Sequence, residues 1–471
     1  MSDPFRNRST ASLAVTAALL AVPYGTPKLS AWRVFGDARA LESVSTIESA
    51  SEVAQPASMP EPLQPTSISG DGVALAAAAP APAAPKAGEP TPVAIEQNAA
   101  MGSFYAQFAK TIGKQDKAIT RILHYGDSTI AADYVTRTVR RLLQEKYGDA
   151  GHGFLLIGKP WPGYEHADVT YSEAYDKWKV ARISGPTAKG GKHGLGGVAY
   201  RGIEGTTSSF GTAARGTIGS QASHLELHYE VEPEGGEVDV ERKGAKTESF
   251  STRGEGGAVK VFRTDFADGP AAFRLVTHGS PKIYGAVLER EGPGVVYDAL
   301  GVVGGRMRHW LDQDGAHWAE ALKLRSPSLV IIQFGSNEAE AENMQDDDYA
   351  NAVRSVIDKV RGAGNVSVML AAPMDRGEAR TDGSVRSLAG IGRVIDVQRR
   401  IAKEKNCAFW DTRAAMGGDG AIGRWARKGL AGDDYVHPTP KGAALLGNIF
   451  YEALIAGYND WRTTHAGAPA P

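Results

Sequence analysis

The sequence predicts an α/β domain built on a five-stranded parallel sheet and interrupted by a long β-rich insertion. Short apolar segments alternate with segments of helical period both before residue 165 and after residue 290, and this alternation is typical of βαβ units. Residues 328–334 (SLVIIQF) are almost continuously apolar, as expected for a parallel strand that helices cover on both faces. Residues 165–290 instead alternate at period two and show no helical pattern.

The chain has 471 residues and a formal net charge of −2. A chain of this length favours two or three domains. The nearly neutral charge gives no sign that nucleic acid or an acidic membrane surface is the main partner. Because Cys407 is the single cysteine, an intrachain disulfide is excluded.

The N-terminal region predicts export. An apolar run at residues 11–22 follows Arg6 and Arg8; it is shorter than the about 20 residues of a membrane-spanning helix and suits the apolar centre of a secretion signal. We expect residues 1–30 to be an export signal or a signal anchor that tethers the protein to the membrane, with a disordered apolar tail as the alternative. The body would then be periplasmic or associated with the cell envelope. Residues 31–94 are rich in Ala and Pro without a hydrophobic period, which predicts a disordered linker.

The folded body is predicted to begin near Ile95. Residues 121–125 (RILHY) form the first strand, and a helix of regular apolar spacing follows from Ser128 until Gly148 ends it. The same pattern returns after the insertion, with strands at residues 295–300, 328–334, 366–372 and 407–411 and helices at residues 349–360, 391–401 and 439–456. The α/β domain thus comprises residues 95–164 and 291–462, followed by a flexible tail at 463–471.

The insertion at residues 165–290 predicts an all-β domain. Alternation at period two is clearest at residues 225–231 and 238–240, and glycine-rich turns separate these from further apolar segments. Several short strands joined by turns are typical of a sandwich or a jelly roll. The insertion leaves after the helix of Ser128 and returns before the second strand, so we expect its ends to lie at the rim of any site formed there.

Gly126-Asp127-Ser128 lies where the first strand meets the first helix. Ligands of open parallel sheets bind beyond the carboxyl ends of the strands, and a serine in a first helical turn is close to unpaired N–H groups that stabilise an oxyanion. Ser128 is therefore a candidate nucleophile. The alternative is a serine that only caps the helix.

Asp434 and His437 stand three residues apart, just before the last predicted helix. A serine hydroxyl needs a base such as histidine to take its proton, and a carboxylate fixes the imidazole and stabilises its charged form. These two residues can supply that pair, with Asp433 as a competing carboxylate. The alternative is an ordinary surface loop.

Two further candidates follow strands of the predicted sheet. Asn337, in Gly335-Ser336-Asn337-Glu338, follows the strand SLVIIQF; its amide can donate to an oxyanion or form an Asx turn. Gly304, after the strand at 295–300, allows a backbone N–H to approach a ligand closely. Gly305 is an alternative to Gly304, and an ordinary turn between strand and helix is an alternative to both.

The order Ser128, Gly304, Asn337 and Asp434-x-x-His437 resembles the SGNH/GDSL hydrolase family, whose name lists its four characteristic residues. The resemblance covers about residues 121–163 and 295–458 and leaves the insertion outside. It implies a flavodoxin-like three-layer fold with strand order 2-1-3-4-5, and ester hydrolysis without metal or other cofactor. It also implies a catalytic triad of Ser128, Asp434 and His437, and an oxyanion hole formed by the amides of Ser128 and Gly304 and the side chain of Asn337.

The inserted β region resembles the bacterial peptidoglycan O-acetylesterase branch, in which a carbohydrate-binding-like domain follows the first motif, although Thr129 stands where that branch has a histidine. This implies deacetylation of an exported, acetylated glycan, preferably peptidoglycan. Acetyl transfer to the same class of glycan and an inactive carbohydrate-binding protein are the alternatives. Trp161 and Tyr164 are candidates for a sugar-stacking platform or, equally, for anchors of their loop. The histidines outside these motifs lack metal-ligand spacing, so no metal is expected.

Overall fold

A computed structural model describes residues 88–171, 177–186, 189–341, 344–465 and 467–471. All described residues belong to one compact unit, Pro82–Pro471. The predicted export segment at residues 1–30 and the predicted linker up to residue 87 lie outside the described residues. Residues 88–94, predicted as linker, are tied to the folded body: Trp410 Nε1 donates to the Val93 carbonyl at 3.1 Å. No helix within the described ranges is long and apolar enough to cross a membrane.

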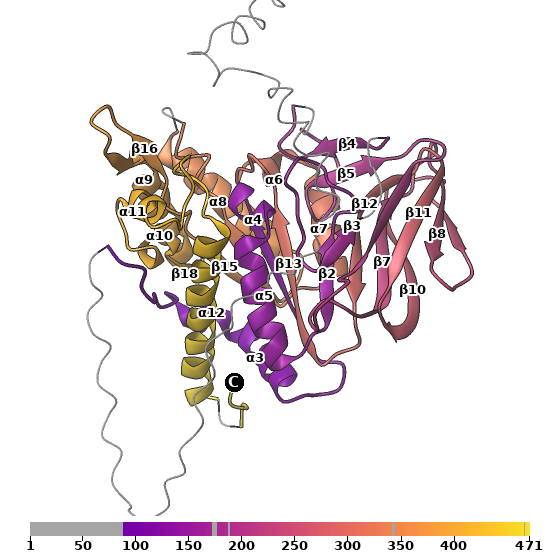
Figure 1. Cartoon of the computed structure of the whole chain (residues 1–471), viewed down its shortest axis with the longest axis horizontal. Helices are drawn as coiled ribbons and strands as arrows, with labels where there is room; N and C mark the ends of the chain where they lie inside the picture. The colour runs from indigo at the N-terminus through magenta and orange to yellow at the C-terminus, as the bar shows by residue number, and fades with distance from the viewer. Residues whose placement is uncertain (1–87, 172–176, 187–188, 342–343, 466) are drawn as a thin grey trace, which may run out of the picture. The chain divides into compact units, whose positions relative to one another are not determined.

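The centre of this unit is a parallel sheet of five strands (Figure 1). Its spatial order is β13 (Gly294–Gly301), β1 (Ile119–Gly126), β14 (Leu329–Gln333), β15 (Ser367–Ala371) and β18 (Ala408–Trp410). Every neighbouring pair is parallel. In chain order these strands are 2-1-3-4-5, so the predicted α/β fold class and strand order are confirmed.

Helices cover both faces of the parallel sheet, as the apolar run of β14 requires. Leu329 and Ile331 belong to one hydrophobic cluster, and Val330 and Ile332 belong to the other, because successive side chains of a strand point to opposite faces. The first cluster includes residues of α3 (Gly102–Ile112), α5 (Tyr134–Tyr147) and α12 (Pro440–Thr463), and the second includes residues of α7 (Gly315–Arg325), α8 (Asp346–Arg361) and α9 (Ala389–Glu404). The result is a three-layer α/β/α arrangement.

Shorter elements connect these layers. They are η3 (Asn98–Met101), α4 (Ser128–Ala131), α6 (His309–Asp312), α10 (Thr412–Ala415), α11 (Ala421–Arg427) and the hairpin of β16 (Gly377–Ala379) and β17 (Val385–Ser387). The long helix predicted after Ser128 is in fact two helices, α4 and α5. Asp133 interrupts them with a left-handed backbone, φ 54°, and its buried carboxylate pairs with Arg140 at 2.7 Å.

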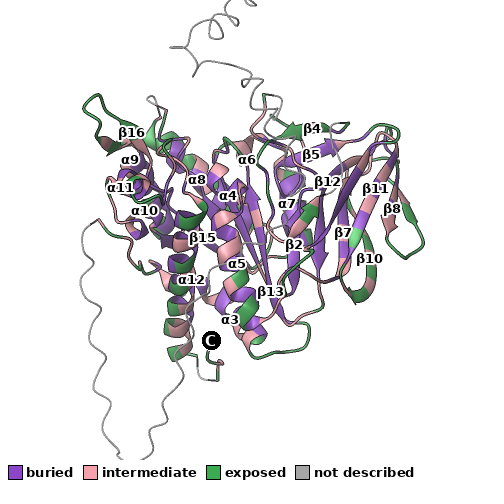
Figure 2. Cartoon of the chain, in the orientation of Figure 1, coloured by how far each residue is buried: buried purple, intermediate pink, exposed green. Residues whose placement is uncertain are grey.

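Two antiparallel sheets make up the β-rich region. One joins β10 (Val259–Gly269), β7 (Ala222–Glu230), β12 (Lys282–Glu289), β5 (Val198–Arg201) and β4 (Lys179–Arg182), with β2 (Gly151–Leu155) also paired to β12. The other joins β3 (Val169–Tyr171), β6 (Thr207–Thr212), β11 (Ala272–Gly279), β8 (Gly236–Arg242) and β9 (Glu248–Ser251). Ring contacts cross between the sheets, such as Phe266 to Phe273 with centroids 5.5 Å apart. The arrangement is therefore a β-sandwich. Its strands β5, β6 and β12 are mostly buried, whereas β4, β9 and β10 are mostly exposed or intermediate (Figure 2).

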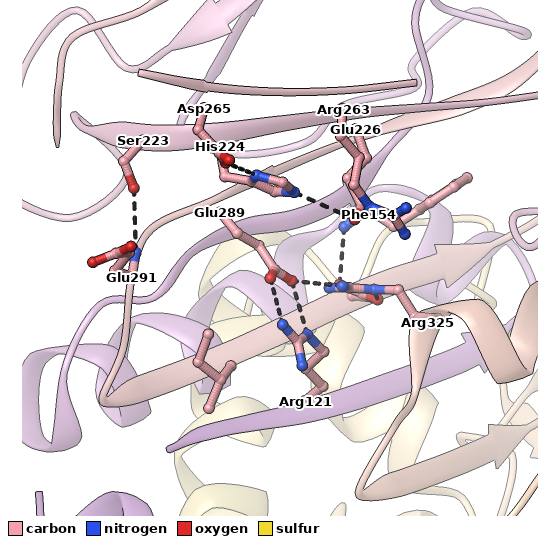
Figure 3. Close-up of polar contacts among 12 residues, drawn as sticks. Arg121, Phe154, Ser223, His224, Glu226, Arg263, Asp265, Glu289, Glu291 and Arg325 are labelled. Atoms are coloured by element: carbon pink, nitrogen blue, oxygen red, sulfur yellow. Dashed lines mark hydrogen bonds and ion pairs between the residues drawn. The ribbon is translucent and has the colours of Figure 1, made fainter. Parts of the chain in front are cut away.

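The antiparallel sheet begins upstream of the predicted boundary at residue 165, because β2 starts at Gly151. The insertion returns at Gly294, which pairs with Ile119 at the amino end of β1; this end therefore lies at the other end of β1 from Ser128, and the expectation that it lies at the rim of the site is wrong. The chain leading into β2 runs along the edge of β13, where Val295 N–H donates to the Gly148 carbonyl at 2.9 Å. A buried ion network joins the same region. Arg325 bonds Asp298 on β13 and Glu289 on β12 at 2.6 and 2.5 Å, and Glu289 also pairs with Arg121 on β1 at 2.7 Å (Figure 3).

Candidate active site

Ser128 stands at the first position of α4, directly beyond the carboxyl end of β1. The turn that presents it is tight: a side chain at Gly126 would collide with Ile130. Asp127 caps α4 by accepting from the Thr129 backbone N–H at 3.0 Å and from the Thr129 hydroxyl at 2.8 Å. Burial raises the pKa of Asp127, although these two hydrogen bonds act to lower it. Asp127 therefore holds the turn, and the Ser128 hydroxyl is left to face its neighbour across the site.

The structure brings Ser128, His437 and Asp434 into one chain of hydrogen bonds. Ser128 Oγ lies 2.8 Å from His437 Nε2, and His437 Nδ1 lies 2.7 Å from Asp434 Oδ2. Burial alone would raise the pKa of Asp434, but the hydrogen bond from the His437 ring and those from two backbone N–H groups lower it. The carboxylate is therefore held ionised beside the imidazole, which is the arrangement that lets a histidine accept a serine proton.

A compact turn holds Asp434 and His437 in register. Asp434 Oδ1 accepts from the backbone N–H groups of Val436 and His437 at 3.0 and 3.1 Å, and Tyr435 between them takes a left-handed φ of 53°. The side chains of Asp434 and His437 are 51% and 45% exposed. The base therefore sits at an open surface that a large substrate can approach.

The two loops predicted to form the oxyanion hole are fastened to each other. Asn337 Nδ2 donates to the Gly305 carbonyl at 2.9 Å, which leaves the second proton of the amide for another acceptor. The Gly305 N–H donates to the Val302 carbonyl at 2.8 Å and is thus engaged within its own turn. Gly304 is exposed with a left-handed φ of 69°, and a Cβ there would meet nothing within 4 Å. These contacts favour Gly304 over Gly305 as the backbone donor.

Two supporting residues were not predicted from the sequence. Glu338 accepts from the Met307 backbone N–H at 2.6 Å, which ties the loop of Asn337 to the loop of Gly304. Burial raises the pKa of Glu338 to about 7. Arg376 donates to the Ser336 carbonyl at 3.2 Å. Glu338 directly follows the Gly-Ser-Asn motif, so its position was visible, but nothing in the sequence pairs it with Met307.

Trp161 and Tyr164 lie in the core instead of on an open surface. They are 5% and 4% exposed, and their rings meet edge to face with centroids 5.6 Å apart. The Tyr164 hydroxyl accepts from the Leu156 backbone N–H at 3.1 Å. Neither ring presents a free face to a sugar, so the placement fits anchors of the loop and not a stacking platform.

The arrangement can perform nucleophilic acyl transfer. A hydroxyl, a base and an ionised carboxylate stand in sequence, and two loops that carry N–H donors flank the hydroxyl. Such donors stabilise the negative charge that develops on the carbonyl oxygen of an ester under attack. The exposure of the site suits an acyl group carried by a polymer.

Comparisons with known proteins agree with this chemistry. The model of the GDSL-like lipase/acylhydrolase family matches residues 266–445, a span that contains Gly304, Asn337, Asp434 and His437 and begins after Ser128. No curated protein matches the chain by sequence.

One solved structure shows the same fold. A peptidoglycan O-acetylesterase structure matches with a TM-score of 0.66 and 22% identity, covering 76% of this chain and 96% of that one. A lipase/acylhydrolase from Enterococcus faecalis matches with a TM-score of 0.28 and 19% identity, covering 34% and 76%. A family two carbohydrate esterase from Clostridium thermocellum in complex with cellohexaose matches with a TM-score of 0.26 and 11% identity, covering 62% and 99%.

Proposed function

We propose that the chain is a serine esterase that removes O-acetyl groups from an exported polysaccharide, with peptidoglycan as the preferred substrate, and the match of residues 266–445 to the GDSL-like lipase/acylhydrolase family model supports this. The observation that carries the proposal is the continuous hydrogen-bond chain from Ser128 through His437 to Asp434. The catalytic roles of these three residues follow from that geometry.

The reaction has two halves. In the first, Ser128 Oγ bonds to the acetyl carbon while its proton passes to His437 Nε2, and the carbonyl oxygen becomes an oxyanion held by the amides of Ser128 and Gly304 and by Asn337. The bond from the acetyl carbon to the sugar oxygen then breaks, and His437 returns the proton to that oxygen. In the second half the oxygen of a water molecule bonds to the acetyl carbon while a water proton passes to His437 Nε2. The bond from the acetyl carbon to Ser128 Oγ then breaks, His437 returns the proton to Oγ, and acetate leaves.

Two observations support a glycan as the carrier of the acetyl group. The triad turn is half exposed, so a polymer can reach it without entering a narrow tunnel. The β-rich region borders the site, because the Ser184 hydroxyl donates to the carbonyl of Val303 at 3.1 Å, beside Gly304. A wall of this kind can hold a chain while a small acyl group reaches the serine.

The test is turnover of 4-nitrophenyl acetate and of O-acetylated peptidoglycan by the full chain, with acetate release measured for the polymer. Ser128→Ala should remove activity on both substrates, whereas Ser249→Ala, a change of an exposed serine on β9, should leave both intact. Wild-type turnover no higher than background on both substrates would refute the proposal and favour an inactive binding protein, and undiminished turnover by Ser128→Ala would refute Ser128 as the nucleophile. Acetyl groups appearing on an added sugar acceptor in place of free acetate would assign acetyl transfer.

We also propose that the body functions outside the cytoplasmic membrane, on the strength of the basic and apolar N-terminus at residues 6–22. Fusion of residues 1–94 to a reporter that is active only after export should yield an active reporter. Activity only of a cytoplasmic reporter would refute export.

A further inference from the structure

An open pocket of about 320 Å³ lies beside the loops that carry Gly304 and Asn337. The pocket is lined by Arg306 and Arg308, which follow Gly304 in the chain, and by residues of α8, including Asp348, Tyr349 and Ala352. Glu338 also lines the pocket. The volume is that of a site for a small ligand or a branch of a larger one.

The cationic wall is free to bind an anion. Arg306 is partly exposed and Arg308 is exposed, and neither guanidinium forms an ion pair with any residue that the structure describes. Asp348 is an exposed carboxylate that also lines the pocket. Because a guanidinium group pairs with a carboxylate through two parallel hydrogen bonds, two such groups on one wall are suited to a carboxylate ligand.

Glu338 supplies a second, independent indication of a ligand. It is 8% exposed, and its Oε1 accepts from Met307 N–H, while its Oε2 is buried without a hydrogen-bond partner among the described residues. A buried polar oxygen without a partner costs free energy. A hydroxyl or amide N–H entering the pocket would supply the missing hydrogen bond.

The pocket adjoins both loops that are predicted to hold the oxyanion. Arg306 is two residues from Gly304 and Glu338 is next to Asn337, and consecutive Cα atoms are about 3.8 Å apart. A substituent on or next to the acetylated sugar can therefore reach the pocket while the ester carbonyl occupies the oxyanion hole.

We propose that this pocket is a specificity subsite that holds a carboxylate-bearing group of the glycan, with Arg306 and Arg308 binding the carboxylate and Glu338 bonding a neighbouring hydroxyl or amide. The proposal rests on the proposed function. The carboxylate can belong to the sugar itself or to a peptide attached to it, and the probes below separate these sources.

The test compares three O-acetylated chains: a neutral chain of N-acetylglucosamine, a peptide-free chain that alternates with N-acetylmuramic acid, and the same acidic chain carrying its peptides. For each variant of the full-length protein, kcat/KM on the acidic chains is divided by kcat/KM on the neutral chain. Arg306→Ala combined with Arg308→Ala should lower this ratio about tenfold, through KM, while Arg306→Lys with Arg308→Lys restores part of it. Arg400→Ala, an exposed arginine on α9, is the matched control and should leave the ratio unchanged. Melting temperatures verify that each variant is folded.

A fall in the ratio for both acidic chains assigns the carboxylate to the sugar, and a fall only for the peptide-bearing chain assigns it to the peptide. A ratio within twofold of wild type for the double alanine variant overturns the subsite. Calorimetry can also measure the affinity of the Ser128→Ala variant for the deacetylated forms of the three chains, which requires no turnover. The protein could bind the acidic chains preferentially through the two arginines and yet hydrolyse none of the chains. This result would refute the proposed function and support the subsite.

Discussion

At the scale of single residues, His437 is the centre of the site, because it contacts both Ser128 and Asp434. We predict that Asp434→Asn lowers kcat on 4-nitrophenyl acetate by about a thousandfold, since an amide neither stabilises the imidazolium nor fixes the productive tautomer. Asp433→Asn is the matched control and should change kcat little, because Asp434 is the residue that contacts the ring. A large loss from Asp433→Asn with little loss from Asp434→Asn would reverse the assignment.

Asn337 is predicted to act on the transition state. Asn337→Ala should lower kcat about a hundredfold, as loss of one oxyanion donor does in other hydrolases. Because Asn337 also donates to the Gly305 carbonyl, thermal melting must show that the fold is retained. Asn351→Ala, an exposed change on α8, should have no effect on kcat. An unchanged rate for Asn337→Ala would show that this amide only holds its loop.

The four motif residues could be predicted because each follows a recognisable strand or precedes a recognisable helix. The sequence favoured Asp434 over Asp433, and Asp434 is the residue that contacts His437; for Gly304 and Gly305 it left the alternative open. What distinguishes the two glycines is a turn, in which the Gly305 N–H already donates to the Val302 carbonyl. Glu338 and Met307 are 31 residues apart, and such a contact depends on tertiary structure that no local pattern records. The sequence also did not reveal how exposed Trp161 and Tyr164 are. Their aromatic side chains could form a sugar-stacking platform, but both are buried in the core.

At the scale of elements, the parallel strands could be predicted because β14 is apolar on both faces. The break between α4 and α5 could not, because it depends on the buried pair of Asp133 and Arg140, residues whose types do not exclude a helix. The start of the antiparallel sheet was also missed. The segment Gly151–Leu155 contains two glycines and a histidine, so it lacks the alternation that marks a strand, and only pairing with β12 makes it one.

The ion network that links β1, β12, β13 and α7 predicts a pH dependence of stability. The charges of Arg325 and Arg121 outweigh burial and lower the pKa of Glu289 from 4.5 to about 2. Because the folded pKa lies below the unfolded one, the stabilisation is complete above about pH 4.5 and is lost as the pH falls toward 2. It amounts to about 3 kcal/mol. Glu289→Gln should lower the free energy of unfolding in urea by about that amount at pH 7.

The pH series supplies the control for this prediction. The difference between wild type and Glu289→Gln should shrink as the pH falls below 4.5, since wild type then loses the same charge. Glu404→Gln removes an exposed acid paired with Arg354 and should change stability by less than about 1 kcal/mol. If Glu289→Gln lowers the free energy of unfolding by the same amount down to pH 2, the loss comes from packing and not from charge.

At the scale of the whole molecule, the β-sandwich and the α/β layers share a hydrophobic core. One buried cluster contains Leu225 and Val240 of the antiparallel sheets together with Val330 and Ile357 of the α/β part. We predict that deletion of residues 165–290 with a short bridge gives no soluble, active protein, because it removes β12 from β2 and leaves Arg325 without Glu289. Soluble expression and 4-nitrophenyl acetate turnover measure this. A folded, active remnant would show that the sandwich is an independent module.

The distance along the chain between the nucleophile and its base also has a consequence for biosynthesis. Ser128 and His437 are 309 residues apart, and β18, α11 and the triad turn all follow the sandwich in the chain. A ribosome must therefore complete nearly the entire polypeptide before any base can reach the serine. A nascent chain that lacks residues 434–437 therefore has the nucleophile without its base, and we expect it to hydrolyse no esters.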